Sequence, residues 1–197
     1  FQVYGEQHHS VAMSYNNIGS VYYNQKDYAQ ALAYCEKALP IQLQVYGEQH
    51  PAVATSYCNI GGVYDNLGNY SQALSYYEKA LSIQLQVYGE QHPAVATSYN
   101  NIGFVHYKQG DYTQALSYYE RALQIQLQVY GEQHPDVATS YVGIGLVYYC
   151  QDDYGQALKC FKKSLQIYRK VFGETHPNTI EVQDIVEQLT LEINETK

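Results

Sequence analysis

Histidine and glutamate recur together at a fixed interval in this sequence, and their side chains are those of acid–base and metal chemistry. Five histidines stand 42 residues apart, and a glutamate precedes each of them by two positions. A Glu–His pair could act as a general acid and base, and several histidines together could bind zinc. The histidines are His8, His50, His92, His134 and His176, and the glutamates are Glu6, Glu48, Glu90, Glu132 and Glu174.

The spacing of these pairs speaks against both kinds of chemistry. Zinc ligands lie about 2.0–2.1 Å from the ion, whereas equivalent residues in stacked helical repeats lie about 10 Å apart. An active site needs unlike residues that converge on one point, and here the same pair recurs five times. We therefore expect each histidine to hydrogen bond a helix end. We predict no catalytic residue, no metal site and no cofactor.

Asparagine forms a second recurrent series, and its chemistry suits a peptide ligand. An amide side chain both donates and accepts hydrogen bonds, so it can pair with the backbone of an extended peptide whatever the peptide's side chains. The alternative is that these amides cap neighbouring turns or bind water. One position holds Asn17, Asn59, Asn101 and then Gly143, and the position before it holds Asn16, Cys58, Asn100 and Val142.

Aromatic and apolar residues follow the asparagines, mainly in the C-terminal half of the chain. The next two positions of the pattern hold Ser20, Gly62, Phe104 and Leu146, and then Tyr23, Asp65, Tyr107 and Tyr149. We therefore expect the C-terminal half to supply the anchoring pockets. Phosphorylation of the tyrosines Tyr23, Tyr107 or Tyr149 would be a way to switch binding.

A repeat of 42 residues positions these side chains and extends over almost the whole chain. In the third period Pro93 suits the first turn of a helix, and apolar residues recur every three or four positions from Val95 to Val105. Gly110 ends this pattern and can take a left-handed turn, after which a second helix is predicted from Tyr112. The repeated string Val-Tyr-Gly-Glu-Gln-His begins at Val3, Val45, Val87 and Val129, and a variant begins at Val171.

Small residues recur inside both predicted helices. The first helix of each period holds Gly19, Gly61, Gly103 or Gly145, and the second holds Ala31, Ala73, Ala115 or Ala157. A glycine inside a helix costs about 1 kcal/mol relative to alanine, so its recurrence predicts that two helices approach closely there. The tyrosines beside these glycines are expected to fill the core. They are Tyr15, Tyr57, Tyr99 and Tyr141.

These residues resemble the tetratricopeptide repeat (TPR). The resemblance rests on the string from Tyr99 to Gly103, on Gly110-Asp-Tyr112, and on Ala115, Tyr119 and Ala122. The 42-residue period and the Gly-Glu-Gln-His-Pro linker are similar to the kinesin light chain variety of the family. The resemblance implies an all-α fold, a right-handed TPR superhelix (α-solenoid) of antiparallel helix pairs. It also implies that the first helix of each pair lines a concave groove. Mapping the family's groove positions onto this sequence gives the predicted peptide-binding residues, which are Asn16, Asn17, Asn59, Asn100, Asn101, Phe104, Tyr107, Leu146 and Tyr149.

We expect the chain to divide along its repeats. The tail of a preceding repeat helix would occupy 1–8, four TPR units would occupy 9–50, 51–92, 93–134 and 135–176, and a capping helix would occupy 177–197. The last helix has an apolar stripe but lacks the tyrosine and glycine of the repeats, as a terminal repeat that faces water should. Because the sequence starts with Phe1, we expect it to be part of a longer protein.

Composition limits the class of partner. The 197 residues include 11 Lys and Arg against 19 Asp and Glu, which gives a net charge of −8. A nucleic-acid-binding protein needs a basic face, and no apolar run approaches the roughly 20 residues of a membrane helix, so we predict neither partner. The four cysteines show no metal-binding or disulfide-like spacing, which predicts reduced thiols and a cytoplasmic location. They are Cys35, Cys58, Cys150 and Cys160.

The first functional hypothesis is a non-catalytic protein–protein interaction scaffold that binds an extended peptide or partner segment in the concave groove. The alternative is a regulatory or sensor TPR arm of a larger signalling ATPase or kinase, which acts intramolecularly or in oligomerisation. TPR domains that hold acidic chaperone tails need Lys and Arg in the groove, and the matching positions here lack them apart from nearby Lys108. The acidic balance favours a neutral or basic partner.

Overall fold

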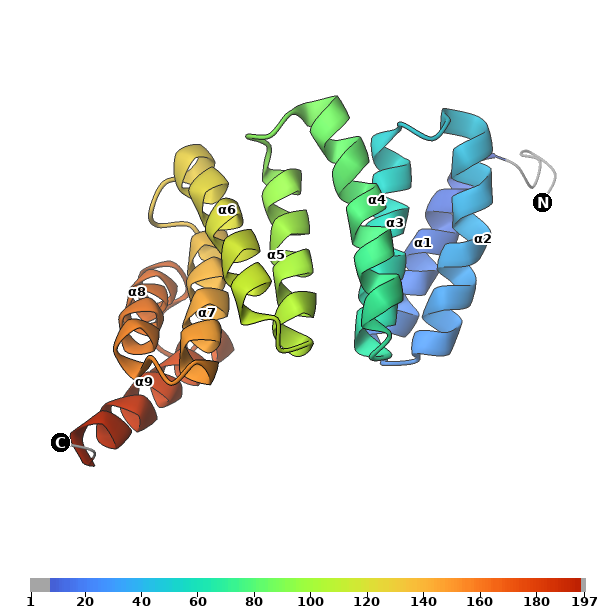
Figure 1. The fold of residues 1–197 in the computed structure, drawn as a ribbon. Helices are drawn as coiled ribbons and strands as arrows, with labels where there is room; N and C mark the ends of the chain where they lie inside the picture. The colour runs from blue at the N-terminus through green and yellow to red at the C-terminus, as the bar shows by residue number, and fades with distance from the viewer. Residues whose placement is uncertain (1–7, 196–197) are drawn as a thin grey trace. The chain divides into compact units, whose positions relative to one another are not determined.

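The computed structural model describes residues 8–195 as an all-helical chain. These residues form nine α-helices and no strand (Figure 1), and consecutive helices pack as pairs. This confirms the predicted α-solenoid architecture of antiparallel helix pairs. Residues 1–7 of the predicted N-terminal tail, and residues 196–197 of the predicted capping segment, lie outside the described residues.

Each repeat contributes a shorter first helix and a longer second helix. The first helices are α1 (His9–Asn24), α3 (Pro51–Asn66), α5 (Pro93–Lys108) and α7 (Pro135–Cys150). The second helices are α2 (Tyr28–Tyr46), α4 (Tyr70–Tyr88), α6 (Tyr112–Tyr130) and α8 (Tyr154–Phe172), and α9 (Pro177–Glu195) follows them. Proline stands in the first turn of α3, α5 and α7, as expected for a residue without a backbone N–H.

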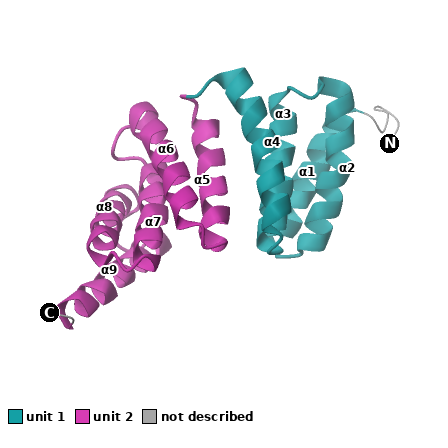
Figure 2. Ribbon diagram, in the orientation of Figure 1, with its two compact units in different colours: residues 1–90 teal, residues 91–197 magenta. Residues whose placement is uncertain are grey.

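The chain forms two compact units, residues 1–90 and 91–197 (Figure 2). In the first unit, α2 packs against both α1 and α3, and α4 packs against α3. In the second unit, α6 packs against α5 and α7, and α8 packs against α7 and α9. Within a unit, a second helix therefore lies against the first helix of its own repeat and against that of the next.

The turn inside each repeat needs a left-handed backbone residue. Gly110 has a φ of 79°, which confirms the predicted turn. The equivalent positions in the first and last repeats hold Lys26 and Asp152, each with a φ of 61°. Left-handed backbone is uncommon for residues with a Cβ. The turn geometry is therefore kept even where the sequence does not supply glycine.

The predicted close approach of helices within a pair is confirmed. A Cβ on Gly61 of α3 would lie 2.9 Å from ring atoms of Tyr77 on α4, and a Cβ on Gly145 would lie 2.9 Å from the ring of Phe161. Ala73 and Ala157 on the second helices are fully buried beside these contacts. The glycines are thus required because a larger side chain would overlap a buried ring.

The recurring tyrosines occupy the core less completely than predicted. Only Tyr99 is buried, and its three equivalents are half-buried. A cation from the second helix lies over each ring: Lys37 over Tyr15, Lys79 over Tyr57, Arg121 over Tyr99 and Lys163 over Tyr141. The ring contributes apolar packing, and its outer face binds the cation.

Neither membrane spans nor disulfides are found in the described part of the chain. None of its helices combines the length and the apolar character needed to cross a bilayer. All four cysteines are free; Cys35 and Cys160 are buried, Cys58 is half-buried and Cys150 is exposed.

Candidate functional site

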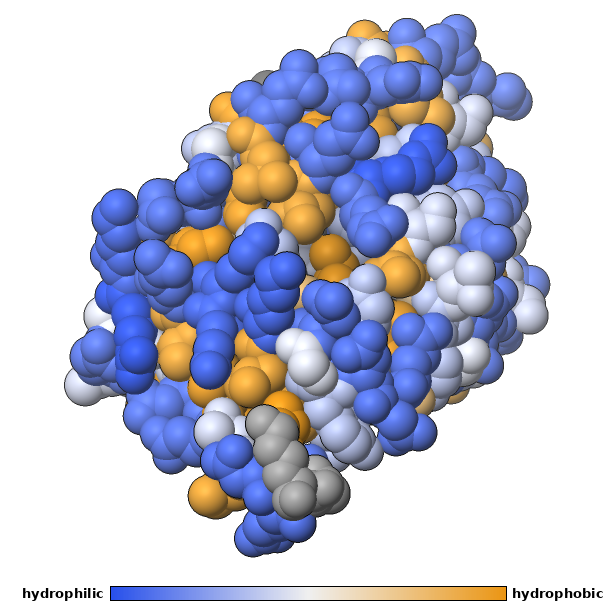
Figure 3. All heavy atoms as spheres, turned by 60° about the vertical axis from the view of Figure 1, so that its left-hand side comes forward, coloured by the Kyte–Doolittle hydropathy of each residue, from blue (hydrophilic) through white to orange (hydrophobic). Residues whose placement is uncertain are grey.

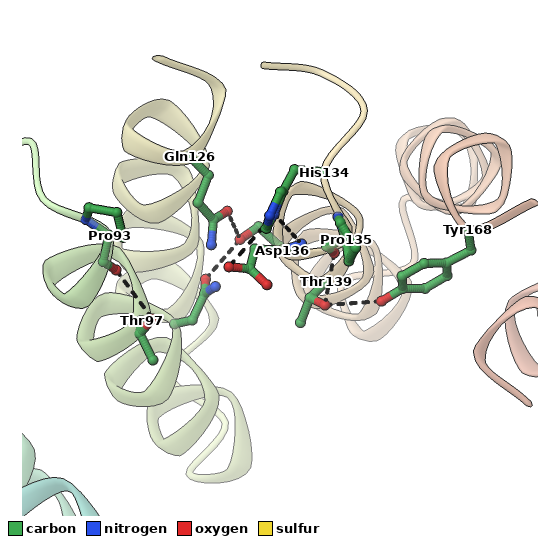
Figure 4. A network of polar contacts seen from close by, with 10 residues as sticks. Pro93, Thr97, Gln126, His134, Pro135, Asp136, Thr139 and Tyr168 are labelled. Carbon is green, nitrogen blue, oxygen red and sulfur yellow. Dashed lines mark hydrogen bonds and ion pairs between the residues drawn. The ribbon is translucent and has the colours of Figure 1, made fainter. Parts of the chain in front are cut away.

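The recurring histidines form the N-terminal caps of the helices that carry the candidate site. In each cap the histidine Nδ1 accepts a hydrogen bond from the backbone N–H two residues later, with N–N distances of 3.1 or 3.2 Å. The rings of His50, His134 and His176 also stack on the aromatic residue that ends the preceding helix, and the Tyr130 and His134 ring centroids lie 3.9 Å apart. Figure 4 shows His134 at the start of α7. The expected role of these histidines at helix ends is confirmed.

Asn16 and Asn100, two of the predicted site residues, bridge neighbouring helices. In the first unit the Nδ2 group of Asn16 on α1 donates a hydrogen bond of 2.9 Å to Ser56 on α3, and Ser56 bonds Gln42 on α2. The remaining side-chain oxygen of Asn16 is buried and has no partner among the described residues. In this position the amide takes part in a chain of hydrogen bonds that joins three helices.

The second unit repeats this arrangement around Ser140 of α7. Its hydroxyl lies 3.0 Å from Oδ1 of Asn100 on α5 and 2.6 Å from Oε1 of Gln126 on α6 (Figure 4). A serine hydroxyl has one proton and cannot donate to both oxygens. A 180° flip of the Asn100 side-chain amide exchanges its oxygen and nitrogen. The Asn100 N–H then donates to Ser140, as that of Asn16 does to Ser56, and the Ser140 hydroxyl donates to Gln126. Asn100 therefore fixes the register of α5 against α7.

The asparagines at the second position of the pattern differ from Asn16 and Asn100 in their contacts. Asn17 is exposed, Asn59 and Asn101 are half-buried, and no described residue hydrogen bonds their side chains. Asn17 follows Asn16, which bonds Ser56 of α3, and Asn101 follows Asn100, which bonds Ser140 of α7. They therefore present both a donor and an acceptor beside the helix-to-helix contact. We use the name first-helix surface for this face of α1 and α3 in the first unit, and for the face of α5, α7 and the equivalent part of α9 in the second.

Aromatic side chains accompany Asn101 in the second unit. Phe104 and Tyr149 are 37% and 41% exposed, so part of each ring is accessible to a ligand. Tyr107 stacks on Phe104 with 6.3 Å between ring centroids, and its hydroxyl lies 3.8 Å from the Cys150 sulfur of α7. Burial, together with the Cys150 contact, raises the pKa of Tyr107 to about 12. Its hydroxyl therefore stays protonated at neutral pH and can donate a hydrogen bond.

A small cavity opens beside Leu146 and Tyr149. These two residues of α7 and a row on α9 surround about 140 Å³, with the buried ring of Phe161 also in the lining. The α9 residues are Ile185, Gln188, Leu189 and Glu192. An apolar cavity of about 150 Å³ accommodates benzene, so this one has room for a single apolar side chain of a ligand.

The structure thus separates the predicted site residues into three groups. Asn16 and Asn100 join helices, and Asn17, Asn59 and Asn101 present free amides. In the second unit, Phe104 and Tyr107 lie together on α5, and Leu146 and Tyr149 line the cavity. No group of three or more potential metal ligands occurs within residues 8–195.

Sequence reasoning missed a set of basic residues on α8, and it named Lys108 as the main cation. The missed residues are Lys159, Lys162, Lys163, Arg169 and Lys170, all of them exposed. A comparison of the four second helices position by position would have found them, because the earlier repeats hold neutral or acidic residues at most of these positions.

Comparison with known proteins identifies the family. The tetratricopeptide repeat model matches residues 10–86, 66–128, 94–170 and 141–195, which together span nearly the whole chain. The chain belongs to the tetratricopeptide repeat family. The comparison of this TPR chain with curated protein sequences finds no match.

Solved structures with the same fold include a kinesin light chain-like protein. The TPR chain superposes on a putative kinesin light chain with nearly identical TPR-like repeats from Podosopora anserina with a TM-score of 0.78 and 19% identity, covering 95% of this chain and 89% of that one. BtubC (BKLC) from P. vanneervenii superposes with a TM-score of 0.75 and 22% identity, covering 94% of this chain and 82% of that one. The apo form of RapI superposes with a TM-score of 0.75 and 21% identity, covering 94% of this chain and 69% of that one. At these identities the likeness establishes the fold alone.

Proposed function

We propose that this TPR chain is a non-catalytic scaffold that binds an extended peptide or partner segment along its first-helix surface. TPR repeats are generally protein-interaction scaffolds, and the chain belongs to that family. The observation that carries the proposal is the set of unpaired amides next to exposed aromatic rings and a side-chain-sized cavity. The free thiols support a reducing, cytoplasmic location for the scaffold.

The spacing of the second unit suits an extended ligand. Packed helices lie about 10 Å apart, and an extended peptide rises about 3.3 Å per residue. Asn101 on α5 would then pair with the peptide backbone about four or five residues away from a side chain placed between α7 and α9. That side chain would enter the cavity beside Leu146 and Tyr149. Asn17 and Asn59 offer the same backbone pairing within the first unit.

The chemistry of this surface favours a ligand with apolar anchors and few charges. Phe104, Tyr107, Leu146 and Tyr149 supply neutral contacts, and the Lys108 ammonium is 5.1 Å from the Phe104 ring centroid. A cation that rests on an aromatic ring is partly engaged already. Backbone pairing by asparagine is independent of the ligand's sequence, so the cavity beside Tyr149 would contribute most of the selectivity.

Site-specific cross-linking tests this proposal. A photo-reactive phenylalanine analogue replaces Tyr149 in one variant and Gln124, an exposed residue of α6, in the matched control. Cross-linked peptides from a cell extract are identified by mass spectrometry and resynthesised, and their affinity is measured by fluorescence anisotropy. We expect a defined peptide from the Tyr149 position alone, and about tenfold weaker binding of that peptide by Tyr149→Ala.

The opposite pattern would contradict the proposal. If the Gln124 position captures the same peptides as the Tyr149 position, contact does not depend on the first-helix surface. Unchanged affinity of Tyr149→Ala for the resynthesised peptide would show that the cavity does not hold an anchor.

A further inference from the structure

Helix α8 differs in charge from every other second helix. It carries five of the chain's 11 Lys and Arg residues and no Asp or Glu. The equivalent positions of α6 hold Ser117, Glu120, Arg121, Leu127 and Gln128, and those of α4 hold Ser75, Glu78, Lys79, Leu85 and Gln86. Four of the five α8 cations therefore replace neutral or acidic residues, in a chain whose net charge is −8.

Two of the five cations have roles within the fold. Lys163 lies 4.8 Å from the ring centroid of Tyr141, as Lys79 and Arg121 do with their own tyrosines at similar range. Arg169 forms an ion pair of 2.9 Å with Glu174 and donates a hydrogen bond of 3.1 Å to Gln183 of α9. These contacts hold the helix pair and the following helix in place.

The other three cations have no such role. Lys159, Lys162 and Lys170 are exposed, and no described residue contacts their ammonium groups. They lie at intervals of three and eight residues, which places them along one side of α8. We call this side of α8, with the hollows beside it, the α8 surface.

Two hollows flank these lysines. One of about 530 Å³ lies between α8 and α9, and its lining includes Leu165 and Val186 together with Lys162 and Lys170. The other, of about 430 Å³, is lined by Leu158 together with Lys159, Lys162 and Lys163. On the face that Figure 3 turns forward, hydrophilic side chains surround separate apolar patches. The hollows of the α8 surface are thus lined by lysine side chains together with apolar side chains such as Leu158 and Leu165.

The length of the α8 surface matches a short peptide. The 11 residue steps from Lys159 to Lys170 span about 16 Å of helix, which about five residues of extended peptide would cover. A peptide with carboxylates near both ends would reach Lys159 and Lys162 at one end and Lys170 at the other. An apolar side chain between the carboxylates would contact the Leu165–Val186 hollow.

The charges around the α8 surface disfavour an extended polyanion. Glu181, Asp184 and Glu187 are exposed on α9, the helix that packs against α8. A nucleic acid or an anionic membrane extends beyond three lysines and would meet these carboxylates, which repel it. A short acidic segment can stay within the basic stripe.

We propose that the α8 surface binds a short acidic segment of a partner protein that carries an apolar residue between its carboxylates. This second binding surface does not rest on the proposed function of the first-helix surface. The two surfaces take ligands of different charge, so one scaffold would join an uncharged peptide to an acidic one.

Fluorescence anisotropy with the full chain tests the α8 surface. The probe is a fluorescein-labelled peptide with the sequence Glu-Glu-Ala-Leu-Ala-Glu-Glu. The test variant is Lys159→Gln/Lys162→Gln/Lys170→Gln. The matched control is Gln44→Glu/Gln86→Glu/Gln128→Glu, which changes the net charge by the same three units at exposed positions equivalent to Lys170 on α2, α4 and α6.

We expect saturable binding that the lysine variant weakens at least about tenfold and the control at most about twofold, because contact rather than net charge holds the peptide. Salt at about 0.5 M should weaken binding by wild type as well. Replacing the peptide's leucine with serine should reduce affinity, and Tyr149→Ala should leave it unchanged.

Several results would overturn the proposal. One is the absence of binding up to about 1 mM peptide. Another is an equal loss of peptide affinity in the lysine variant and in the control. A third is binding of duplex DNA or phosphatidylserine vesicles in preference to the peptide. Loss of acidic-peptide binding in Tyr149→Ala would assign the peptide to the first-helix surface instead.

Discussion

Histidine replaces the usual Ser, Thr, Asp or Asn at the starts of the first helices. Its Nδ1 accepts the backbone N–H that a serine or aspartate oxygen would accept, and its ring stacks on the preceding aromatic residue. The Tyr46 and His50 ring centroids lie 4.2 Å apart. One side chain thus ends the linker and starts the next helix, which accounts for its recurrence in every period.

A substitution at His50 separates these two contributions. His50→Ala removes the cap and the stacked ring, and we expect it to lower the free energy of unfolding by about 1–2 kcal/mol. His50→Asn keeps a capping oxygen and should recover about half of the loss. Urea denaturation followed by circular dichroism measures both variants. Equal stability of His50→Ala and wild type would show that the cap is not needed.

Buried hydroxyl and thiol groups make stability sensitive to alkali. Burial raises the pKa of Cys35 to about 11, and burial raises the pKa of Tyr77 and of Tyr168 above the ordinary value. In the unfolded chain these groups ionise near their ordinary pKa values, about 8.5 for cysteine and about 10 for tyrosine. The folded state therefore holds these protons to higher pH than the unfolded state does.

These groups should consequently not affect stability between neutral pH and about pH 8, and they should lower it as the pH rises toward 11, because the unfolded state loses protons first. The midpoint of urea unfolding at pH 7.5 and at pH 10.5 measures this fall. Cys35→Ala removes one of the groups and should make the fall smaller. An unchanged midpoint across this interval would contradict the assignment of these side chains to the folded core.

Helix pairing depends on the space that glycine leaves. At Gly61 a Cβ would overlap the ring of Tyr77, whereas at the neighbouring Gly62 the nearest atom, the Tyr77 hydroxyl, lies at an ordinary 3.5 Å. Alanine favours a helix over glycine by about 1 kcal/mol at either position. The two positions on α3 therefore form a matched pair.

We expect opposite effects from the two alanine substitutions. Gly61→Ala should destabilise the chain by about 1–3 kcal/mol through overpacking against a buried ring, and Gly62→Ala should stabilise it by up to about 1 kcal/mol. Thermal unfolding followed by circular dichroism measures both variants. If both stabilise the chain, the pair is not closely packed at Gly61.

The sequence predicts the helices well because the signals are local. Pro93 and Gly110 mark the start and end of a first helix, and the apolar spacing marks its inner face. The same local logic could not separate Asn100 from Asn101, since their roles depend on how α5 is rotated against α7. The burial of Tyr99 and the half-burial of its equivalents depend likewise on neighbouring repeats.

The final helix shows how one position can end the pairing. α9 places the exposed Glu187 where α7 has Gly145, the residue that lets α8 approach. A second helix cannot pack closely over a charged side chain of this length, which supports the proposal that α9 caps the repeats. The basic residues of α8 escaped prediction because the repeat pattern directs attention to what the repeats share rather than to where one of them differs.

At the scale of the whole molecule, a repeated helix pair supplies both a rigid frame and a row of equivalent positions. Asn100 and Asn101 illustrate the division, because adjacent residues of one helix serve the frame and the proposed ligand respectively. Asn100→Ala should therefore lower the melting temperature by several degrees and leave peptide affinity of the folded chain nearly unchanged.

The affinity of Asn101→Ala for the peptide captured at Tyr149, measured by fluorescence anisotropy beside wild type and Asn100→Ala, tests the central claim most directly. We predict at least about tenfold weaker binding with an unchanged melting temperature. Wild-type affinity in folded Asn101→Ala would show that the unpaired amides of the first helices do not bind the ligand.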